Sequence, residues 1–249
     1  MTSNRFFIDK RKPDFPYAVL RGEEHHHLRN VARIKTGEKI WLIDGSGQNY
    51  RARVDKIEKN QTRLFILDTE TKTEPRVKVS LAQALIKARN FELILQKATE
   101  LGVREFLPVT TSRSVIKIEN KLESKVARWT KIVREAAKQS GIYQVPVVHQ
   151  PKTLHAVVRE RGAALKIVLH ESRGKPLRHF LTPGKKIKQP GDYPSSVLVL
   201  IGPEGGWTEE EEEDIVSHGF EAISLGHQIL RTETAAISSM AMIDHFWNQ

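Results

Sequence analysis

Two glycine-containing turns near the end of the sequence carry side chains suited to holding a ligand. The first turn, GPEGGW at residues 202–207, follows an apolar run and leads into six consecutive acidic residues, 209–214. The second turn, LGHQILRTET at residues 225–234, follows a shorter apolar run, and a third predicted strand ends at Leu169-His170-Glu171. Glycine lets the backbone approach a ligand closely, and parallel α/β sheets bind ligands at the carboxyl ends of their strands. We therefore predict that these three strand ends form one pocket.

The first turn does not match a phosphate-binding loop. A P-loop places Lys and then Ser or Thr after its glycines, whereas Trp207 and Thr208 stand there, and the glycine spacing is not that of a dinucleotide fingerprint. The acidic run suits the positive end of a helix but would repel a pyrophosphate. Thr208 and Glu211 have the spacing of a capping box. We therefore expect a ligand without phosphate, or a turn that serves only the fold, and we reject a nucleotide-dependent oxidoreductase.

The elements that would position these turns alternate between strands and helices after residue 72. This pattern predicts an α/β domain at residues 73–249 with a mostly parallel sheet. Residues 1–72 are β-rich, with a hairpin pattern around Asp44-Gly45-Ser46-Gly47. A polar stretch at 69–76 predicts a linker, and residues 184–196 predict a loop. The predicted strands are 62–70, 77–85, 103–111, 164–172, 196–205 and 220–226, and the predicted helices are 90–102, 121–141 and 233–247.

The composition favours a basic protein from a reducing compartment. The chain has no cysteine, which excludes disulfides, cysteine-ligated zinc and thiolate nucleophiles. Its net charge is +10, and six of its thirty acidic residues lie in the run 209–214, so the rest of the chain carries 40 basic residues against 24 acidic ones. Such a surface attracts polyanions, of which nucleic acid is the most common. Because no run is long enough for a membrane span and the N-terminus lacks a signal peptide, we expect no membrane contact and a cytoplasmic location.

The paired C-terminal motifs resemble the signature of a known enzyme family. IGPEGGWTEEE and LGHQILRTETAA are closely similar to the RsmE-type methyltransferases of the SPOUT class, which methylate N3 of a uridine in 16S ribosomal RNA. The resemblance continues in LAQALIKARNFELILQKATELGV at residues 81–103 and in SRSV at residues 112–115. It reaches the first block through His27-Leu28 and Asp44-Gly45-Ser46-Gly47, so it covers nearly the whole chain.

This resemblance implies a fold, a cofactor and a partner. Residues 1–72 would form a PUA-like RNA-binding β-barrel, and residues 73–249 a SPOUT α/β domain with a C-terminal trefoil knot. The chain would bind S-adenosyl-L-methionine, act on 16S ribosomal RNA of the small ribosomal subunit, and form a homodimer. This cofactor has no phosphate and carries a cationic sulfonium, so an acidic helix start beside it is tolerable. The implied cofactor-binding residues are Leu169, His170, Glu171, Ile201, Gly202, Glu204, Gly205, Gly206, Leu225, Gly226, Ile229, Leu230, Arg231, Thr234 and Ala235.

The implied reaction assigns roles to individual side chains. N3 of uridine must lose its imide proton and attack the methyl group in line, so the protein has to position the base and stabilise charge on the uracil oxygens. We assign that stabilisation to Arg231, with a structural salt bridge as the alternative. Glu233 would either orient Arg231 or accept the proton. Candidate RNA contacts, each with plain surface charge as its alternative, are Arg5, Arg11, His27, Arg33, Lys87, Arg89 and Arg113.

A run of histidines, two departures from the family pattern and two alternative functions also have to be considered. The run His25-His26-His27 predicts no metal site, because consecutive side chains point in different directions and no second cluster completes a ligand set. Ile142 and Gln228 stand where the family commonly has basic residues, which leaves details of RNA docking open. Two other functions fit the sequence: a methyltransferase of the same class acting on another RNA or atom, and a non-catalytic RNA chaperone or assembly factor.

Overall fold

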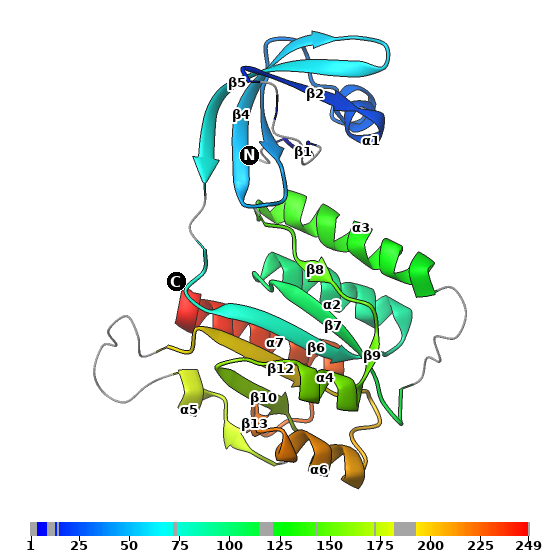
Figure 1. Cartoon of the computed structure of the whole chain (residues 1–249), viewed down its shortest axis with the longest axis vertical. Helices are drawn as coiled ribbons and strands as arrows, with labels where there is room; N and C mark the ends of the chain where they lie inside the picture. The colour runs from blue at the N-terminus through cyan, green and yellow to red at the C-terminus, as the bar shows by residue number, and fades with distance from the viewer. Residues whose placement is uncertain are drawn as a thin grey trace. The chain divides into compact units, whose positions relative to one another are not determined.

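The computed structural model describes residues 4–8, 13, 15–71, 74–114, 122–142, 144–171, 173–181 and 193–248. The chain forms two compact units, and Figure 1 labels most of their helices and strands. The first unit comprises Met1–Glu74 and Arg134–Val145, and the second comprises Pro75–Val133 and Pro146–Gln249. The long helix α3, Leu122–Ser140, therefore contributes its first part to the second unit and its last part to the first. Within the described residues, no helix combines the length and the apolar character that crossing a bilayer requires.

The first unit is built on a five-stranded sheet with the order β1-β3-β4-β5-β2. Alternate residues of β2 and β4 are buried, so one face of the sheet packs on a core that contains Leu20, Leu42 and Leu64. The predicted hairpin around Gly45 is confirmed, because β3 and β4 pair antiparallel. The elements are β1 (Arg5–Phe7), β2 (Tyr17–Arg21), α1 (Gly22–His26), a π-helical turn (His27–Val31), β3 (Lys39–Ile43), β4 (Gln48–Ile57) and β5 (Gln61–Thr71).

This sheet is curled but open. The sequence predicts a β-barrel, whereas β1 and β2 form the two edges of the sheet in the described part of the chain. The β4–β5 pair carries register shifts at Arg51/Ala52 and Val54/Lys56, and such bulges bend a sheet. The β-content was predicted correctly, and the closure into a barrel was not. The predicted linker also begins too early, since β5 continues to Thr71.

The last part of α3 joins the first unit through Lys138. This side chain is only 7% exposed, and its ammonium group lies 2.9 Å from a carboxylate oxygen of Glu24 and 3.1 Å from Nδ1 of His27. Arg5 donates to the carbonyl groups of Lys138 and Gln139, at 3.5 and 3.2 Å, where the helix has no further amide donors of its own. Two predicted RNA contacts, Arg5 and His27, therefore hold α3 in the first unit.

The second unit is a parallel sheet with the order β11-β13-β10-β12-β6-β7-β8, and β9 pairs with β7. The predicted parallel arrangement is confirmed, because every strand pair described in this sheet is parallel. The strands are β6 (Lys78–Ala84), β7 (Glu105–Thr110), β8 (Val147–Val148), β9 (Lys152–Thr153), β10 (Leu165–Leu169), β11 (Lys175–Pro176), β12 (Ser196–Ile201) and β13 (Glu221–Ser224). Besides the first part of α3, the helices are α2 (Ala88–Glu100), α4 (Leu154–Glu160), α5 (Arg178–Leu181), α6 (Glu209–Ser217) and α7 (Thr232–Ile243), and α7 continues as a π-helical turn, Asp244–Asn248.

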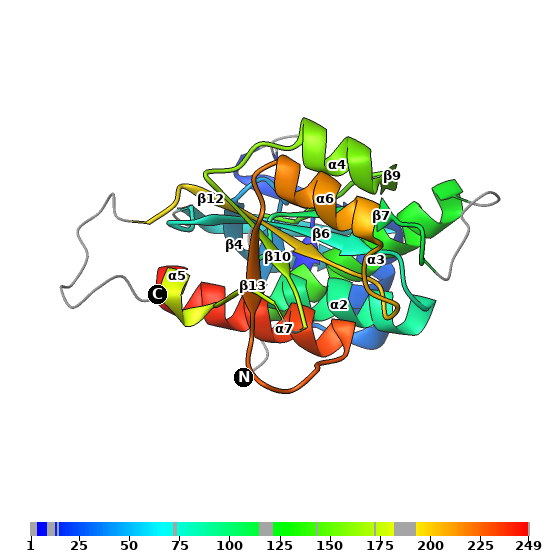
Figure 2. The ribbon, with the colours of Figure 1, turned by 90° about the horizontal axis from the view of Figure 1, so that it is seen from below.

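Helices cover both faces of this sheet. In Figure 2, α4 and α6 lie on one face, and α2 and α7 lie on the other. The apolar run of β12 is accordingly buried along its length, with Leu198 and Leu200 packed in a core that also contains Leu107 and Val157. The predicted long helices correspond to α2, α3 and α7 within a few residues.

Several short elements were missed by the sequence predictions. Neither β2 and α1 in the first unit nor α4 in the second was predicted, and β8, β9 and β11 are only two residues long. Elements of this length carry too few residues for a periodic apolar pattern. Of the predicted loop at 184–196, residues 184–192 lie outside the described part of the chain.

The amino ends of β6 and β7 carry a polar cluster centred on Glu105. This carboxylate accepts a hydrogen bond from Ser80 at 2.7 Å and lies 2.7 Å from Nε2 of His149 and 3.5 Å from the guanidinium of Arg161. Burial by itself would raise the pKa of Glu105. The hydrogen bonds from Ser80 and His149, together with the charge of Arg161, outweigh burial and lower that pKa below its ordinary value. The cluster therefore stabilises the edge of the sheet opposite the two glycine turns.

Candidate active site

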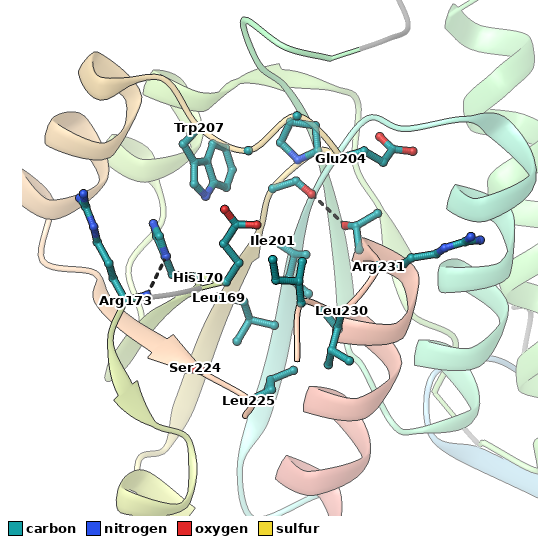
Figure 3. Close-up of a pocket in the computed structure, with 18 of the residues that line it drawn as sticks. Leu169, His170, Arg173, Ile201, Glu204, Trp207, Ser224, Leu225, Leu230 and Arg231 are labelled. Atoms are coloured by element: carbon teal, nitrogen blue, oxygen red, sulfur yellow. Dashed lines mark hydrogen bonds between the residues drawn. The ribbon is translucent and has the colours of Figure 1, made fainter. Parts of the chain in front are cut away.

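The carboxyl ends of β10, β12 and β13 meet around a cavity of about 600 Å³ (Figure 3). The three strands are neighbours in the order β13-β10-β12 and run parallel, so the residues that follow them reach the same edge of the sheet. This volume is typical of a site for a small molecule. Of the residues predicted to bind the cofactor, all but Thr234 line it: Leu169, His170, Glu171, Ile201, Gly202, Glu204, Gly205, Gly206, Leu225, Gly226, Ile229, Leu230, Arg231 and Ala235.

Further residues line the cavity that were not predicted to bind the cofactor. They are Arg113, Arg173, Pro203, Trp207, Glu212, Ser224, Gln228 and Thr232. Pro203, Trp207, Ser224, Gln228 and Thr232 lie within or directly beside the predicted turns, so the motifs themselves pointed to them. Arg173 and Glu212 follow closely on the predicted strand end and on the first turn, whereas Arg113 reaches the cavity from a distant part of the sequence.

The first turn is braced from outside by Arg113. One terminal nitrogen of its guanidinium, Nη1, donates to the carbonyl oxygens of Gly205 at 2.8 Å and Trp207 at 2.9 Å. Gly206 has a φ of 68°, in the left-handed region where glycine is favoured, so the sharp reversal depends on this residue type. Arg113 was predicted to contact RNA phosphate, and the structure places it in the wall of the cavity.

Glu211 fixes the same turn to the start of α6. The predicted capping box is confirmed: Thr208 Oγ1 accepts from the amide of Glu211 at 3.2 Å, and Glu211 Oε2 accepts from the amide of Thr208 at 3.0 Å. The other carboxylate oxygen of Glu211 accepts from the amide of Ser112 at 2.7 Å. One acid of the acidic run therefore caps its own helix and holds the loop that carries Arg113.

Trp207 sets the shape of the wall next to Gly202. A side-chain carbon added at Gly202 would lie 3.0 Å from the Trp207 ring, closer than ordinary van der Waals contact. The ring is buried in the core of the second unit and has little room to move. Gly202 is therefore required for the tight packing of this turn, which the sequence predicted only as close backbone approach.

The second turn is far more exposed than the first. Ile229 is 74% exposed and Leu230 is 37% exposed, although both line the cavity. Arg231 precedes the first turn of α7, and in Figure 3 its side chain extends away from the apolar cluster of Leu169, Ile201 and Leu230. Within the described part of the chain, the Arg231 guanidinium makes no ion pair, so the structural salt bridge considered as its alternative role is not present there.

A buried hydrogen-bond chain joins the two turns. Thr232, at the start of α7, donates through Oγ1 to the carbonyl oxygen of Gly202 at 2.8 Å. Gln83, at the end of β6, donates through Nε2 to the same hydroxyl at 3.3 Å. Both side chains are buried. Sequence reasoning missed this chain, because the sequence separates Gln83 from Thr232 by 149 positions.

Both carboxylate and guanidinium groups line the cavity. Nε2 of His170 lies 3.3 Å from Oε1 of Glu212, and Nη1 of Arg173 lies 3.4 Å from the other oxygen of Glu212. The backbone amide of Arg173 donates to Nδ1 of His170 at 3.0 Å. Glu171 and Glu204 line the cavity and are exposed. These two exposed carboxylates can face a cationic group of a ligand.

Most of the residues predicted to act in catalysis or to contact RNA do not line the cavity, in contrast to the predicted cofactor-binding residues. Glu233 lies in the first turn of α7 and is half-buried, without lining the cavity. Arg33, Lys87 and Arg89 are exposed, the first in the first unit and the other two at the start of α2. Arg11 lies outside the described residues. The roles of these residues stay predictions.

The residues predicted to depart from the family pattern are also placed. Gln228 lines the cavity, and Ile142 is half-buried just beyond the end of α3. The run of histidines is partly structural, because His25 is buried and its Nδ1 lies 2.8 Å from Thr62 Oγ1.

Comparison with known proteins supplies the family. An RNA methyltransferase domain model matches residues 72–244, and an RNA methyltransferase PUA domain model matches residues 20–67. The chain is 32% identical over 247 residues to the ribosomal RNA small subunit methyltransferase E of Bacillus subtilis, covering 97% of this chain and 96% of that protein. It is 34% identical to the Synechocystis protein of the same name, covering 91% of this chain and 72% of that one.

A solved structure agrees with these sequence matches. The ribosomal RNA small subunit methyltransferase E of Neisseria gonorrhoeae, bound to S-adenosyl methionine, is 30% identical, with a TM-score of 0.86 and 98% of each chain covered. The shared fold, the two domain models and the identities over nearly full length agree. The chain belongs to the ribosomal RNA small subunit methyltransferase E family.

Proposed function

We propose that this protein transfers the methyl group of S-adenosylmethionine to N3 of a specific uridine in 16S ribosomal RNA of the small subunit. The observation that carries the proposal is the exposed Arg231, which has no ion-pair partner in the described chain and stands at the rim of a cavity lined without a phosphate-binding loop. Family membership and the relatives' printed name support the substrate class.

The residues of the cavity fit S-adenosylmethionine. The ligand is phosphate-free and cationic at sulfur, and the cavity offers apolar side chains and the carboxylates of Glu171, Glu204 and Glu212. When bound, this cofactor supplies an electrophilic methyl group.

The chain itself would supply positioning and charge stabilisation. When N3 loses its imide proton, negative charge spreads onto the two uracil oxygens, and the planar guanidinium of Arg231 can donate paired hydrogen bonds to one of them. In-line attack of N3 on the methyl group then forms the N–C bond as the S–C bond breaks, which neutralises that charge. We propose that Glu233, one residue into α7, either orients Arg231 or accepts the imide proton. A carboxylate in the first turn of a helix is stabilised by the helix dipole.

The experiment that tests this function is a direct one. Small ribosomal subunits from a strain lacking the gene are incubated with the purified protein and labelled S-adenosylmethionine, and the modified nucleotide is mapped by mass spectrometry. We expect 3-methyluridine to be absent from the strain's 16S RNA and restored at one site by the protein. An unchanged 3-methyluridine level in the strain would overturn the proposal.

The same experiment separates the alternative functions. Loss of a different modified nucleotide in the strain would indicate a related methyltransferase with another target. Calorimetric titration with S-adenosylmethionine tests the non-catalytic RNA chaperone, because RNA binding alone does not require the cavity. Absence of both cofactor binding and methyl transfer would favour that chaperone.

We also propose the finer features that the family resemblance implies. Residues 1–72 would act as a PUA-like RNA-binding domain and residues 73–249 as the methyltransferase domain. The C-terminal part of the methyltransferase domain would form a trefoil knot. The protein would act as a homodimer in the cytoplasm. Light scattering during size-exclusion chromatography tests the homodimer, and a monomeric mass would exclude it.

A further inference from the structure

The solvent face of the first unit's sheet carries an unusual row of side chains. The register places Tyr17 of β2 opposite Phe65 of β5, Phe65 opposite Arg53 of β4, and Arg53 opposite Lys39 of β3. Tyr17, Arg53 and Lys39 are exposed and Phe65 is half-buried, so all four project from the face that is not on the core. We call these four residues the aromatic–basic row.

The aromatic rings of the row are packed for contact through their faces and edges. The ring centroids of Tyr17 and Phe65 lie 5.6 Å apart at an interplanar angle of 76°. The guanidinium carbon of Arg53 lies 5.7 Å from the Phe65 centroid, and that of the neighbouring Arg63 lies 5.4 Å from the Tyr17 centroid. Tyr17 is 42% exposed. Rings held in place by guanidinium groups lose little conformational freedom when a planar ligand stacks on them.

Apolar and basic side chains flank the row on both sides, since Val19 pairs with Arg63 on one side and Leu67 and Arg51 lie on the other. Val19 and Leu67, next to the rings on β2 and β5, are 40% and 41% exposed. Arg51 is exposed near the row on β4, and Arg63 is exposed beside Tyr17 with its guanidinium 2.6 Å from the carboxylate of Asp55. The interior of a protein–protein interface is usually poor in charge, whereas aromatic rings among positive charges suit a polyanion with planar groups.

From this arrangement we propose that the aromatic–basic row, with Arg51 and Arg63, binds a single-stranded segment of RNA. Its unpaired bases stack on Tyr17 and Phe65, and its phosphates contact the basic side chains. Single strands are favoured over duplexes because only unstacked bases can reach a ring on a sheet face. The proposal deepens the proposed function, on which it rests, by assigning a substrate surface that the predicted RNA contacts did not include.

The test measures RNA binding by the full chain with fluorescently labelled oligouridine and a duplex of equal length. The variant Tyr17→Ala/Phe65→Ala should weaken oligouridine binding by between about fivefold and a hundredfold, while the slope of log affinity against log salt stays unchanged. Arg53→Ala should instead lower that slope by about 0.7, the value for one phosphate contact on a single strand. Binding of the duplex should be weaker than that of oligouridine and insensitive to the aromatic change.

Controls separate stacking from folding and from general surface effects. Tyr17→Leu/Phe65→Leu keeps apolar volume on the sheet and should lose affinity almost as the alanine variant does. Phe15→Ala removes a ring that is 60% exposed in the same unit but contacts Tyr50, on the inward-facing side, and it should bind RNA normally. An unchanged circular-dichroism spectrum and thermal unfolding profile would show that the first unit of each variant is folded.

The outcomes of these measurements test the RNA-binding surface independently of the proposed methyl transfer. The proposed RNA-binding surface would be wrong if the leucine variant bound oligouridine as tightly as the wild type does. It would also be wrong if Phe15→Ala lost as much oligouridine affinity as the alanine variant of the row. Intact RNA binding combined with loss of protein association in the variants would assign the face to a protein partner instead. If the wild type binds oligouridine through the row but methylates no ribosomal RNA, the proposed function fails and the surface stands.

Discussion

The two turns that build the cavity differ in how firmly the rest of the chain holds them. The first, at residues 202–207, is clamped by Arg113, capped by Glu211 and packed against a buried Trp207. The second, at residues 225–231, is largely exposed and is tied back through the preceding Ser224 and the following Thr232. The difference indicates a division of labour, in which the rigid turn shapes the cofactor site and the open turn presents Arg231 to the substrate.

The strongest test of this division between the two turns is to remove the guanidinium of Arg231 from the open turn. We expect Arg231→Ala to lower kcat for methyl transfer by about 100-fold to 1,000-fold, the effect of losing one group that stabilises developing charge. Affinity for S-adenosylmethionine, measured by calorimetry, should change little. Arg231→Lys keeps the positive charge but lacks the paired donors, so its kcat should lie between those of the wild type and Arg231→Ala. Equal losses of affinity and rate in Arg231→Ala would assign the residue to the structure of the site.

The rigid turn can be tested by adding one methyl group to it. Gly202→Ala places a carbon 3.0 Å from the buried Trp207 ring, and overpacking of this kind costs about 1–3 kcal/mol. We therefore expect a loss of cofactor affinity of about fivefold to a hundredfold by calorimetry. Gly205→Ala is the matched control, because its added carbon would meet Arg113 Cβ at 3.4 Å, an ordinary contact. If both variants bind the cofactor as wild type does, the first turn is not the rigid wall.

The link between the two turns predicts a smaller effect. Thr232→Val removes the hydroxyl that joins Gly202 and Gln83 and leaves buried polar groups without their partner, which should lower the free energy of unfolding by roughly 1–2 kcal/mol. Both the melting temperature and the cofactor affinity should fall. Thr232→Ser retains the hydroxyl and should restore most of both. Restoration of stability but not of affinity would mean that the hydroxyl alone does not align the turns.

The smallest effect is expected for Glu105, at the amino ends of the strands and away from the cavity. Because this residue has no role in the site, its variant provides a baseline for the other three. The pKa of Glu105 is lower in the folded protein than its ordinary value of 4.5, so its ionised form stabilises the fold above that pH, and this contribution is lost as pH falls through the folded pKa. Glu105→Gln should therefore destabilise the protein at neutral pH by about 1 kcal/mol. In chemical denaturation the difference from wild type should shrink on acidification below pH 4.5. A difference that is constant with pH would contradict a contribution from the charge.

Local patterns predicted local structure well. The capping box of Thr208 and Glu211, the hairpin around Gly45 and the strands of the parallel sheet all depend on neighbours in sequence, and the structure confirms them. The convergence of three strand ends followed from the general behaviour of parallel sheets, and it placed nearly the whole predicted cofactor set around one cavity.

Long-range contacts were beyond the reach of the sequence. Nothing near Arg113 indicates that its guanidinium lies against Gly205, and the amide of Ser112 lies 99 positions from the carboxylate that binds it. Arg5 was assigned to RNA because a basic residue near a terminus resembles surface charge, whereas it holds the end of a helix more than 130 positions away. The first sheet is open where a barrel was predicted, and whether its edge strands pair is not encoded in any local pattern.

The shared helix α3 has a consequence for dividing the protein. A single cut after Glu74 does not yield two complete pieces, since residues 134–145 belong to the first unit but follow the second unit's first segment in the chain. A fragment that begins at Pro75 would carry Lys138 without Glu24, and so would expose a cation that is nearly enclosed in the intact protein. An independent first unit would require grafting of residues 134–145 onto Met1–Glu74 rather than simple truncation.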